Sequence, residues 1–295
     1  MTEPPRERYS LRPTASLCRR KLVNHAMEAL ATLAALAAVA VLGLVVWAVA
    51  KRGAAALNKD FFTQVPPTFG ETGGGIANSI VGSIVIVLLG AALALPIGVA
   101  IAIYLNELAP ARIRRPVGLF LDVLNGLPSI VIGIFIFGLL VVGHGQAAWK
   151  ASIALGIIML PLIARSTQEV LALVPNALRE GALALGVSRW RSTLGVIVPS
   201  ALGGIFTGAT LAIARAAGET APLLFVSSVT TSQVSWDPKQ ALQSIPLTIF
   251  EFLESPNPDD HAKAWAAALV LMTFVLILSL ISKAFLARSR RKLAR

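Results

Sequence analysis

The stretch IANSIVGSIVIVLLGAALALPIGVAIAIYL occupies residues 76–105 and contains no charged side chain. An α-helix needs about 20 mostly apolar residues to cross the hydrocarbon layer of a bilayer, so this stretch can span it with room for tilt. Pro96 predicts a kink inside it, because proline removes a backbone hydrogen bond from a helix. We therefore expect a fold built from helices in a membrane.

The composition of the whole chain indicates the same class. Of its 295 residues, 56% are hydrophobic and 14% are charged, whereas soluble domains usually carry about 25% charged residues. The formal net charge of +11 is compatible with nucleic-acid binding, but the mean hydropathy of +0.74 favours a membrane instead. The single cysteine, Cys18, excludes a disulfide within the chain and any multi-cysteine metal site.

Six apolar windows of suitable length predict an all-α, polytopic membrane protein with six transmembrane helices. The fourth window is short unless it continues through Arg165, and Pro128 predicts a break inside the third. Pro246 and Glu251 interrupt a further apolar stretch at 241–253, which predicts an interfacial or re-entrant segment. The six windows are 26–50, 76–105, 117–142, 151–164, 196–217 and 264–287.

The basic residues predict the orientation, because Lys and Arg are retained on the cytoplasmic side. With both termini inside, the only basic residues expected outside are Lys51, Arg52, Lys59, Lys150, Lys239 and Lys263. The basic tails at 1–25 and 288–295 are then cytoplasmic. The C-terminal tail could bind nucleic acid, but its position directly after a span favours contact with anionic lipid. Between the tails we expect a first helix with its outer loop at 26–71 and a membrane core at 72–287.

The motifs of several catalytic classes are missing. Lysine never follows glycine, so the chain lacks the phosphate-binding loop G-x-x-x-x-G-K-[ST]. Neither H-E-x-x-H nor G-x-S-x-G occurs, and the three histidines lie at different span ends. The segments between the windows are too short for a folded catalytic domain. We expect a chain that is not an enzyme and that holds no cofactor or metal of its own.

The region VPNALREGALALGVSRWRSTLGVIVPSALGGI, residues 174–205, interrupts the apolar sequence between the fourth and fifth windows. Pro175 can open a helix, Gly186 can end it and Ser188 can cap the next one. The pattern predicts a helical hairpin at 174–199 on the inner face. Its apolar side chains can enter a groove on another protein, or they can rest on the lipid surface with Trp190 in the interface, and the spacing alone leaves both open.

The same region resembles a motif of ABC-importer permeases, E-A-A, three residues, G, nine residues, I-x-L-P. The spacing agrees at every position, although glycine replaces the middle alanine and valine replaces the isoleucine and the leucine. The resemblance implies that the hairpin is a coupling helix that docks in a cleft of a separate ATPase subunit. It assigns this contact to Glu180, Gly181, Ala182, Gly186, Arg189 and Pro199.

The resemblance extends over about residues 72–286 and points to the PstA-type permeases of phosphate importers. It is carried by 73–108, by LPSIVIGIFIFGLLV (127–141), by ARAAGETAPLLF (214–225) and by 245–271. It implies a type I importer permease core (MetI-like) with one extra N-terminal helix, in the bacterial inner membrane. The implied partners are a second permease subunit (PstC-like), a dimer of ATPase subunits (PstB-like) that binds Mg-ATP, and an extracytoplasmic phosphate-binding protein (PstS-like). Inorganic phosphate is the implied substrate, and no nucleic acid is expected.

Two ionisable residues, Arg215 and Glu219, lie four positions apart in and just beyond the fifth window, which predicts that they share one helix face. A charge at membrane depth usually marks a pathway or a partner. Arg215 can donate to a phosphate oxyanion while Glu219 holds its guanidinium, or the two can form a structural salt bridge. The polar residues Asn78, Asn125 and Ser129 can line the same translocation path or make ordinary interhelical hydrogen bonds.

A row of small residues occupies every fourth position of the same window. Small side chains let two helices approach closely, so this row predicts helix packing more than a pore. Its members are Gly204, Gly208, Ala212 and Ala216.

Three other functions keep some of these features. A permease for sulfate, molybdate or phosphonate would share the whole architecture. A secondary transporter would show inverted internal repeats, which this sequence lacks, and a membrane enzyme would need catalytic groups clustered at one interface. The sequence favours a permease that imports phosphate by alternating access, with ATP hydrolysed on another subunit.

Overall fold

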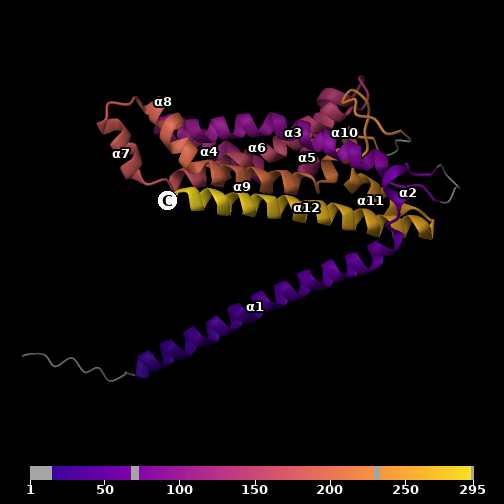
Figure 1. Ribbon diagram of the computed structural model, residues 1–295, viewed down its shortest axis with the longest axis horizontal. Helices are drawn as coiled ribbons and strands as arrows, with labels where there is room; N and C mark the ends of the chain where they lie inside the picture. Colours follow the sequence, from indigo (N-terminus) through magenta and orange to yellow (C-terminus); the bar gives the residue numbers. More distant parts are fainter. Residues whose placement is uncertain (1–14, 68–72, 229–232, 294–295) are drawn as a thin grey trace, which may run out of the picture. The chain divides into compact units, whose positions relative to one another are not determined.

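The computed structural model describes residues 15–67, 73–228 and 233–293 (Figure 1). Every regular element in these ranges is a helix, which confirms the all-α expectation. The chain divides into two units, one ending at Lys51 and one beginning at Arg52.

The first unit consists of helix α1, which runs from Ala15 to Gly53 and crosses into the second unit at its last residues. It begins well before the predicted window at 26–50 and includes the end of the predicted tail. None of its most apolar segment is buried against protein. A helix that is apolar on all sides and unburied is suited to hydrocarbon, since water would penalise every face.

The structure contains five described helices that are long and apolar enough to span a membrane, and a sixth span only if a bent pair is counted as one. This pair is α4 (Ala111–Gly126) with α5 (Ser129–Ile136) and its π-helical extension η3 (Phe137–Val141), and it bends by 96°. The third window is therefore not one straight span. The break lies at Leu127 and Pro128, where proline was expected to end a helix.

Pro96 does not act in the same way. Helix α3 (Ala77–Ile103) continues through it and is prolonged by a π-helical turn, η2 (Tyr104–Leu108). Helix α3 is therefore not broken at Pro96. Helix α6 (Ala148–Ala172) continues through Arg165 and is long enough to span, which resolves the short fourth window.

Within the second unit, α3, α6, α9 (Val198–Ala216) and α12 (Pro258–Leu293) run lengthwise beside one another (Figure 1). The short helices α7 (Asn176–Ala184) and α8 (Arg189–Ser192) lie at one end, where η2, α6 and α12 also end. The opposite end carries α2 (Lys59–Thr63), α10 (Ala221–Val226) and α11 (Ile245–Glu254). The ten-residue α11 is too short to be a seventh span.

The helix pair α3 and α6 forms the centre of the core. A side chain added at Gly90 would come within 2.9 Å of the Ser152 carbonyl oxygen, and one at Gly98 within 3.0 Å of Ile163. Glycine at both positions lets the two backbones approach, so the pair buries its apolar side chains without a gap. The largest fully buried side chains on these helices are Ile86, Leu155, Met159, Ile163 and Leu171.

Candidate functional site

The hairpin at one end of the bundle has the geometry that its sequence predicts. Pro175 is the N-cap of α7, and the helix ends in two backbone hydrogen bonds, from Gly186 to the Leu183 oxygen at 2.9 Å and from Val187 to the Ala182 oxygen at 3.1 Å. This bond pair is a Schellman motif, which places its glycine in the left-handed region. Gly186 has φ of 76°, so the turn of the hairpin depends on glycine.

Beyond the turn the chain is helical from Arg189 to Ala216, through α8, the π-helical η4 (Thr193–Ile197) and α9. This helix begins earlier than the predicted window at 196–217. Ser188 stands at the N-cap of α8, but its side chain makes no cap hydrogen bond, contrary to the expectation. Pro199 lies near the start of α9, directly after the π-helical η4, and it is exposed.

The outer surface of the hairpin exposes large apolar side chains. Leu185 is 84% exposed and Trp190 is 54% exposed. Glu180 and Gly181 are exposed, and Glu180 makes no hydrogen bond or ion pair with any described residue. Ala182 faces inward and is buried. A carboxylate beside exposed leucine and tryptophan is a surface suited to contact with another protein.

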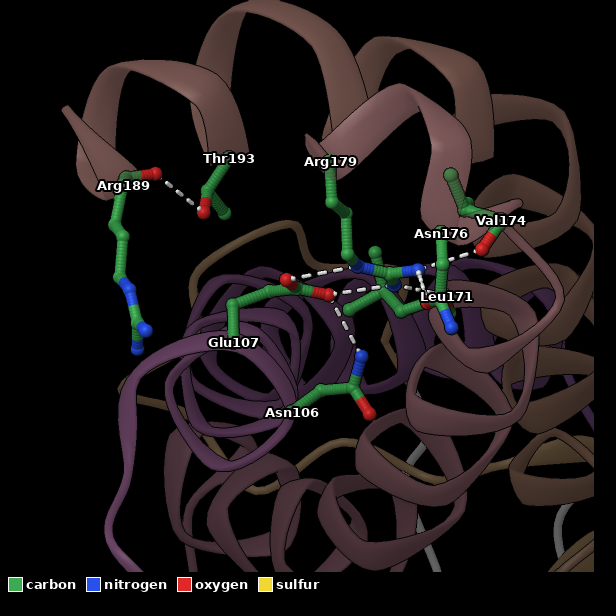
Figure 2. Close-up of polar contacts among 8 residues, drawn as sticks. All are labelled: Asn106, Glu107, Leu171, Val174, Asn176, Arg179, Arg189 and Thr193. Atoms are coloured by element: carbon green, nitrogen blue, oxygen red, sulfur yellow. Dashed lines mark hydrogen bonds and ion pairs between the residues drawn. The ribbon is translucent and has the colours of Figure 1, made fainter. Parts of the chain in front are cut away.

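The inner surface of the hairpin is fastened by Arg179. Its Nε donates to Glu107 Oε2 at 3.2 Å and its Nη2 to Glu107 Oε1 at 2.9 Å, which makes a bidentate ion pair. The same guanidinium donates to the backbone oxygens of Leu171 at 2.8 Å and Val174 at 2.6 Å (Figure 2). These oxygens lie at and just beyond the C-terminal end of α6, where carbonyl groups lack helical partners. Arg179 therefore joins α7 to both η2 and α6.

Two further contacts complete this cluster. Asn106 Nδ2 donates to Glu107 Oε1 at 2.7 Å, and Arg179 Nη1 donates to Asn176 Oδ1 at 3.2 Å (Figure 2). The Glu107 side chain is 8% exposed and that of Arg179 is 21% exposed. Arg189 is not bonded to this cluster. Its backbone oxygen accepts a hydrogen bond from Thr193 Oγ1 at 2.8 Å, and its side chain is exposed.

A groove of about 520 Å3 opens beside the hairpin, between the ends of α6 and α9. Its polar lining includes Ser166, Glu169, Ser200 and Thr207. Ser200 and Thr207 donate to carbonyl oxygens one turn earlier in their own helix, so their hydroxyl groups can offer the groove only acceptor positions.

The row of small residues on α9 lies against α6. A side chain at Gly204 would come within 2.4 Å of Val170, and one at Gly208 within 2.4 Å of Ser166 Oγ. Ala212 and Ala216 are buried in the main apolar core. The row therefore lies in a helix contact, and its two glycines have no room for a larger side chain.

Arg215 and Glu219 do not share a helix face. Helix α9 ends at Ala216 with Ala217 as its C-cap, so Glu219 lies in the following turn. Among the described residues the two side chains form no ion pair with each other or with any other group. Arg215 is exposed and Glu219 is half-buried, near the end of α9 that faces away from the hairpin. Both charges remain available to a partner or a ligand.

The other candidates for the path are not gathered around Arg215 by any described hydrogen bond. Asn78, 2% exposed at the start of α3, donates to Gln243 Oε1 at 3.0 Å. Gln243 in turn donates to Glu251 of α11 at 2.5 Å. Burial raises the pKa of Glu251, an effect that the Gln243 hydrogen bond opposes and the Asp260 charge reinforces. Asn78 therefore belongs to a buried network that fastens α11 to α3.

Asn125 and Ser129 flank the break between α4 and α5. Asn125 is exposed and Ser129 is half-buried. Nearby, Arg165 of α6 holds α4 through Asp122, at 2.6 Å between Nη2 and Oδ2, and through the Gly118 backbone oxygen at 2.6 Å. Arg165, expected only to mark the inner end of a span, therefore positions the broken helix.

Sequence reasoning missed Glu107. It is separated from Arg179 by 72 residues, so no local spacing connects them. One signal was present, because Glu107 is the first carboxylate after the long uncharged stretch 76–105, and a buried charge close to a span requires a partner.

The described helices are those of a protein embedded in a membrane, and the hairpin exposes leucine and tryptophan side chains at one end of the bundle. The family described as binding-protein-dependent transport system inner membrane component matches residues 94–291. A chain of the MetNI methionine ABC transporter, in an inward-facing conformation, superimposes with a TM-score of 0.60 over 72% of this chain and 95% of that one, at 16% identity. An amino acid ABC transporter matches with a TM-score of 0.52 at 19% identity. These two matches show the fold.

Curated relatives are more similar in sequence. The phosphate transport system permease protein PstA of Pasteurella multocida is 38% identical over 269 residues, which is 90% of this chain and 95% of that protein. PstA 1 of Mycobacterium tuberculosis H37Rv is 35% identical, covering 86% of each chain. The chain therefore belongs to the family of binding-protein-dependent transport inner membrane components, and within it groups with the PstA proteins.

Proposed function

We propose that this chain is the permease subunit of an ATP-driven phosphate importer and forms part of its translocation path by alternating access. The observation that carries the proposal is the 38% identity to a PstA protein over 95% of that protein's length. Because the match covers nearly the whole length of that protein, it includes the segments that form its functional sites as well as those that set its fold. The exposed hairpin supports the same function, since an importer subunit without a nucleotide-binding loop needs a surface that receives motion from outside.

The proposed division of labour assigns ATP hydrolysis to a separate pair of ATPase subunits that bind Mg-ATP, and no cofactor to this chain. Glu180, Leu185 and Trp190 present a free carboxylate and apolar side chains to that partner. A second permease subunit and an extracytoplasmic phosphate-binding protein complete the assembly. The hairpin and the C-terminal end of α12 lie at the same end of the bundle, which supports cytoplasmic placement of both (Figure 1).

Arg215 is proposed to take part in the path. Its guanidinium is a fixed cation with several donors, a good match to a phosphate oxyanion, and it forms no ion pair within the described chain. A carboxylate of the second permease subunit or the substrate itself can supply the missing charge. Glu219, in the turn beyond α9, is placed at the outer end of the same route.

The experiment is ATP hydrolysis by the reconstituted four-component complex. We expect phosphate-loaded binding protein to stimulate hydrolysis, and sulfate to have no effect as stimulant or competitor. Stimulation by sulfate, molybdate or a phosphonate in place of phosphate would assign another oxyanion. Hydrolysis that ignores the binding protein altogether would refute an importer.

A further inference from the structure

We propose that Glu107 and Arg179 form the link by which movement of the hairpin is passed to α3, so that α3 and α6 move with the hairpin as one body. This inference rests on the proposed function, because it concerns how the hairpin transmits work. Both residues act through other groups and are positioning residues.

The covalent connections of the hairpin explain why such a link is needed. The chain enters α7 directly from α6 and leaves through α8 and η4 into α9. Helix α3 does not adjoin the hairpin along the chain, because η2, which prolongs α3, ends about 70 residues before α7 begins. Among described residues, no ion pair other than Arg179 with Glu107 joins the hairpin to α3 or η2. Force applied to α7 therefore reaches α3 by two routes: through α6, which packs against α3, and directly through this pair and the apolar contacts around it.

The chemistry of the pair suits a stiff link. The planar guanidinium makes two parallel hydrogen bonds to one carboxylate, which fixes both distance and orientation. Its remaining donors are held by the Leu171 and Val174 backbone oxygens, so the fork cannot rotate away without losing contacts to α6. A lysine offers a point charge without the planar fork, so it could not make the bidentate pair with Glu107.

The surroundings support transmission beyond the pair. Glu107 lies in a π-helical turn closed by the Ala109 amide, which donates to the Tyr104 oxygen at 2.7 Å, and such turns are frequent at functional sites. Beneath the hairpin, Ile103, Leu171, Val174 and Ile197 form one buried cluster that joins α3, α6 and η4. Further along, α3 and α6 are in close backbone contact at Gly90. A displacement at the hairpin is thus carried into the central pair.

The first test compares Glu107→Gln and Arg179→Gln, alone and combined, with Asp122→Asn as the matched control. Asp122 forms an arginine–carboxylate pair at the α4–α6 contact that includes no residue of the hairpin. We expect each hairpin variant to lower phosphate transported per ATP hydrolysed about tenfold, within the usual range for coupling between two sites. We expect the double variant to be no worse than either single one, because the residues act as a unit. Asp122→Asn should keep the wild-type ratio.

The ratio separates coupling from folding. An unchanged ratio in Glu107→Gln, an equal loss in Asp122→Asn, or a loss of transport and hydrolysis together in proportion to assembled complex would each overturn the inference. If the wild-type complex shows no phosphate-stimulated hydrolysis, the proposed function fails instead.

A second measurement on the same complexes does not need transport. Spin labels at Leu185→Cys and Leu93→Cys, in a Cys18→Ala background, report the distance between the hairpin and α3; both leucines are exposed. We expect a narrow distance distribution in the wild type and in Asp122→Asn, and a broader one in Glu107→Gln. Equal widths in all three would show that the pair does not hold the hairpin to α3.

Discussion

Replacing Gly186 with alanine is expected to impair coupling by distorting one turn. The residue has φ of 76°, and an L-residue in the left-handed region costs about 1–2 kcal/mol. No atom lies within 4 Å of the position that the new Cβ would occupy, so the whole effect is conformational. A penalty of this size lowers the equilibrium constant between the intact and the distorted hairpin about 5- to 30-fold, which sets the largest loss of uptake that the change can cause.

Gly181→Ala is the matched variant, four residues before the C-cap in the same short helix. Its added Cβ also meets nothing within 4 Å, and its φ is not positive. Alanine raises the stability of a helix interior by about 1 kcal/mol relative to glycine. This change also restores the alanine of the family motif, so transport should be equal or higher.

The assay is ATP-dependent phosphate uptake by membrane vesicles, divided by the amount of this chain in the membrane. We expect Gly186→Ala to lower uptake by at most about 30-fold and Gly181→Ala to lose nothing. Wild-type uptake in Gly186→Ala would show that the Schellman turn is not required. An equal loss in both variants would show that the hairpin tolerates no change there, and the conformational argument would fail.

Three further changes test other parts of the molecule. Gly208→Val should destabilise the fold by about 1–3 kcal/mol through overpacking, because the new Cβ would meet Ser166 at 2.4 Å, and the melting temperature in detergent should fall. A wild-type melting temperature would refute the close contact of α9 with α6. Arg215→Gln should reduce phosphate uptake far more than membrane abundance, whereas equal loss of both would assign it a structural role. Burial raises the pKa of Glu251 above its ordinary 4.5, so ionisation of this carboxyl group destabilises the fold as pH rises above that value. Glu251→Gln should therefore raise the melting temperature more at neutral pH than near pH 4.5. The opposite order would refute the burial argument.

Much of the fold follows from local rules that a sequence displays directly. A helix must be apolar over a fixed length to cross the hydrocarbon layer, so the membrane helices could be predicted from apolar windows. The hairpin could be predicted because Pro175 and Gly186 mark the two ends of α7. Pro128 lies at the break between α4 and α5, as expected. Pro96 does not end a helix, since α3 continues through it while packed against α6. A single residue type therefore has different outcomes in different packing environments.

The candidate site was less predictable, because its contacts join distant residues. The pairing of Arg179 with Glu107 bridges 72 positions, and the buried bond of Asn78 to Gln243 bridges 165. The expected shared face of Arg215 and Glu219 was wrong for a local reason, since α9 ends before Gly218. That glycine was visible in the sequence and is a typical helix terminator.

The most direct test of the account is uptake of radiolabelled phosphate by proteoliposomes that contain both permease subunits, with the ATPase subunits and ATP inside and loaded binding protein outside. The account predicts accumulation that stops when the ATPase subunits are omitted and that falls, by at most about 30-fold, when Gly186 is replaced with alanine. Accumulation of phosphate without the ATPase subunits would contradict it.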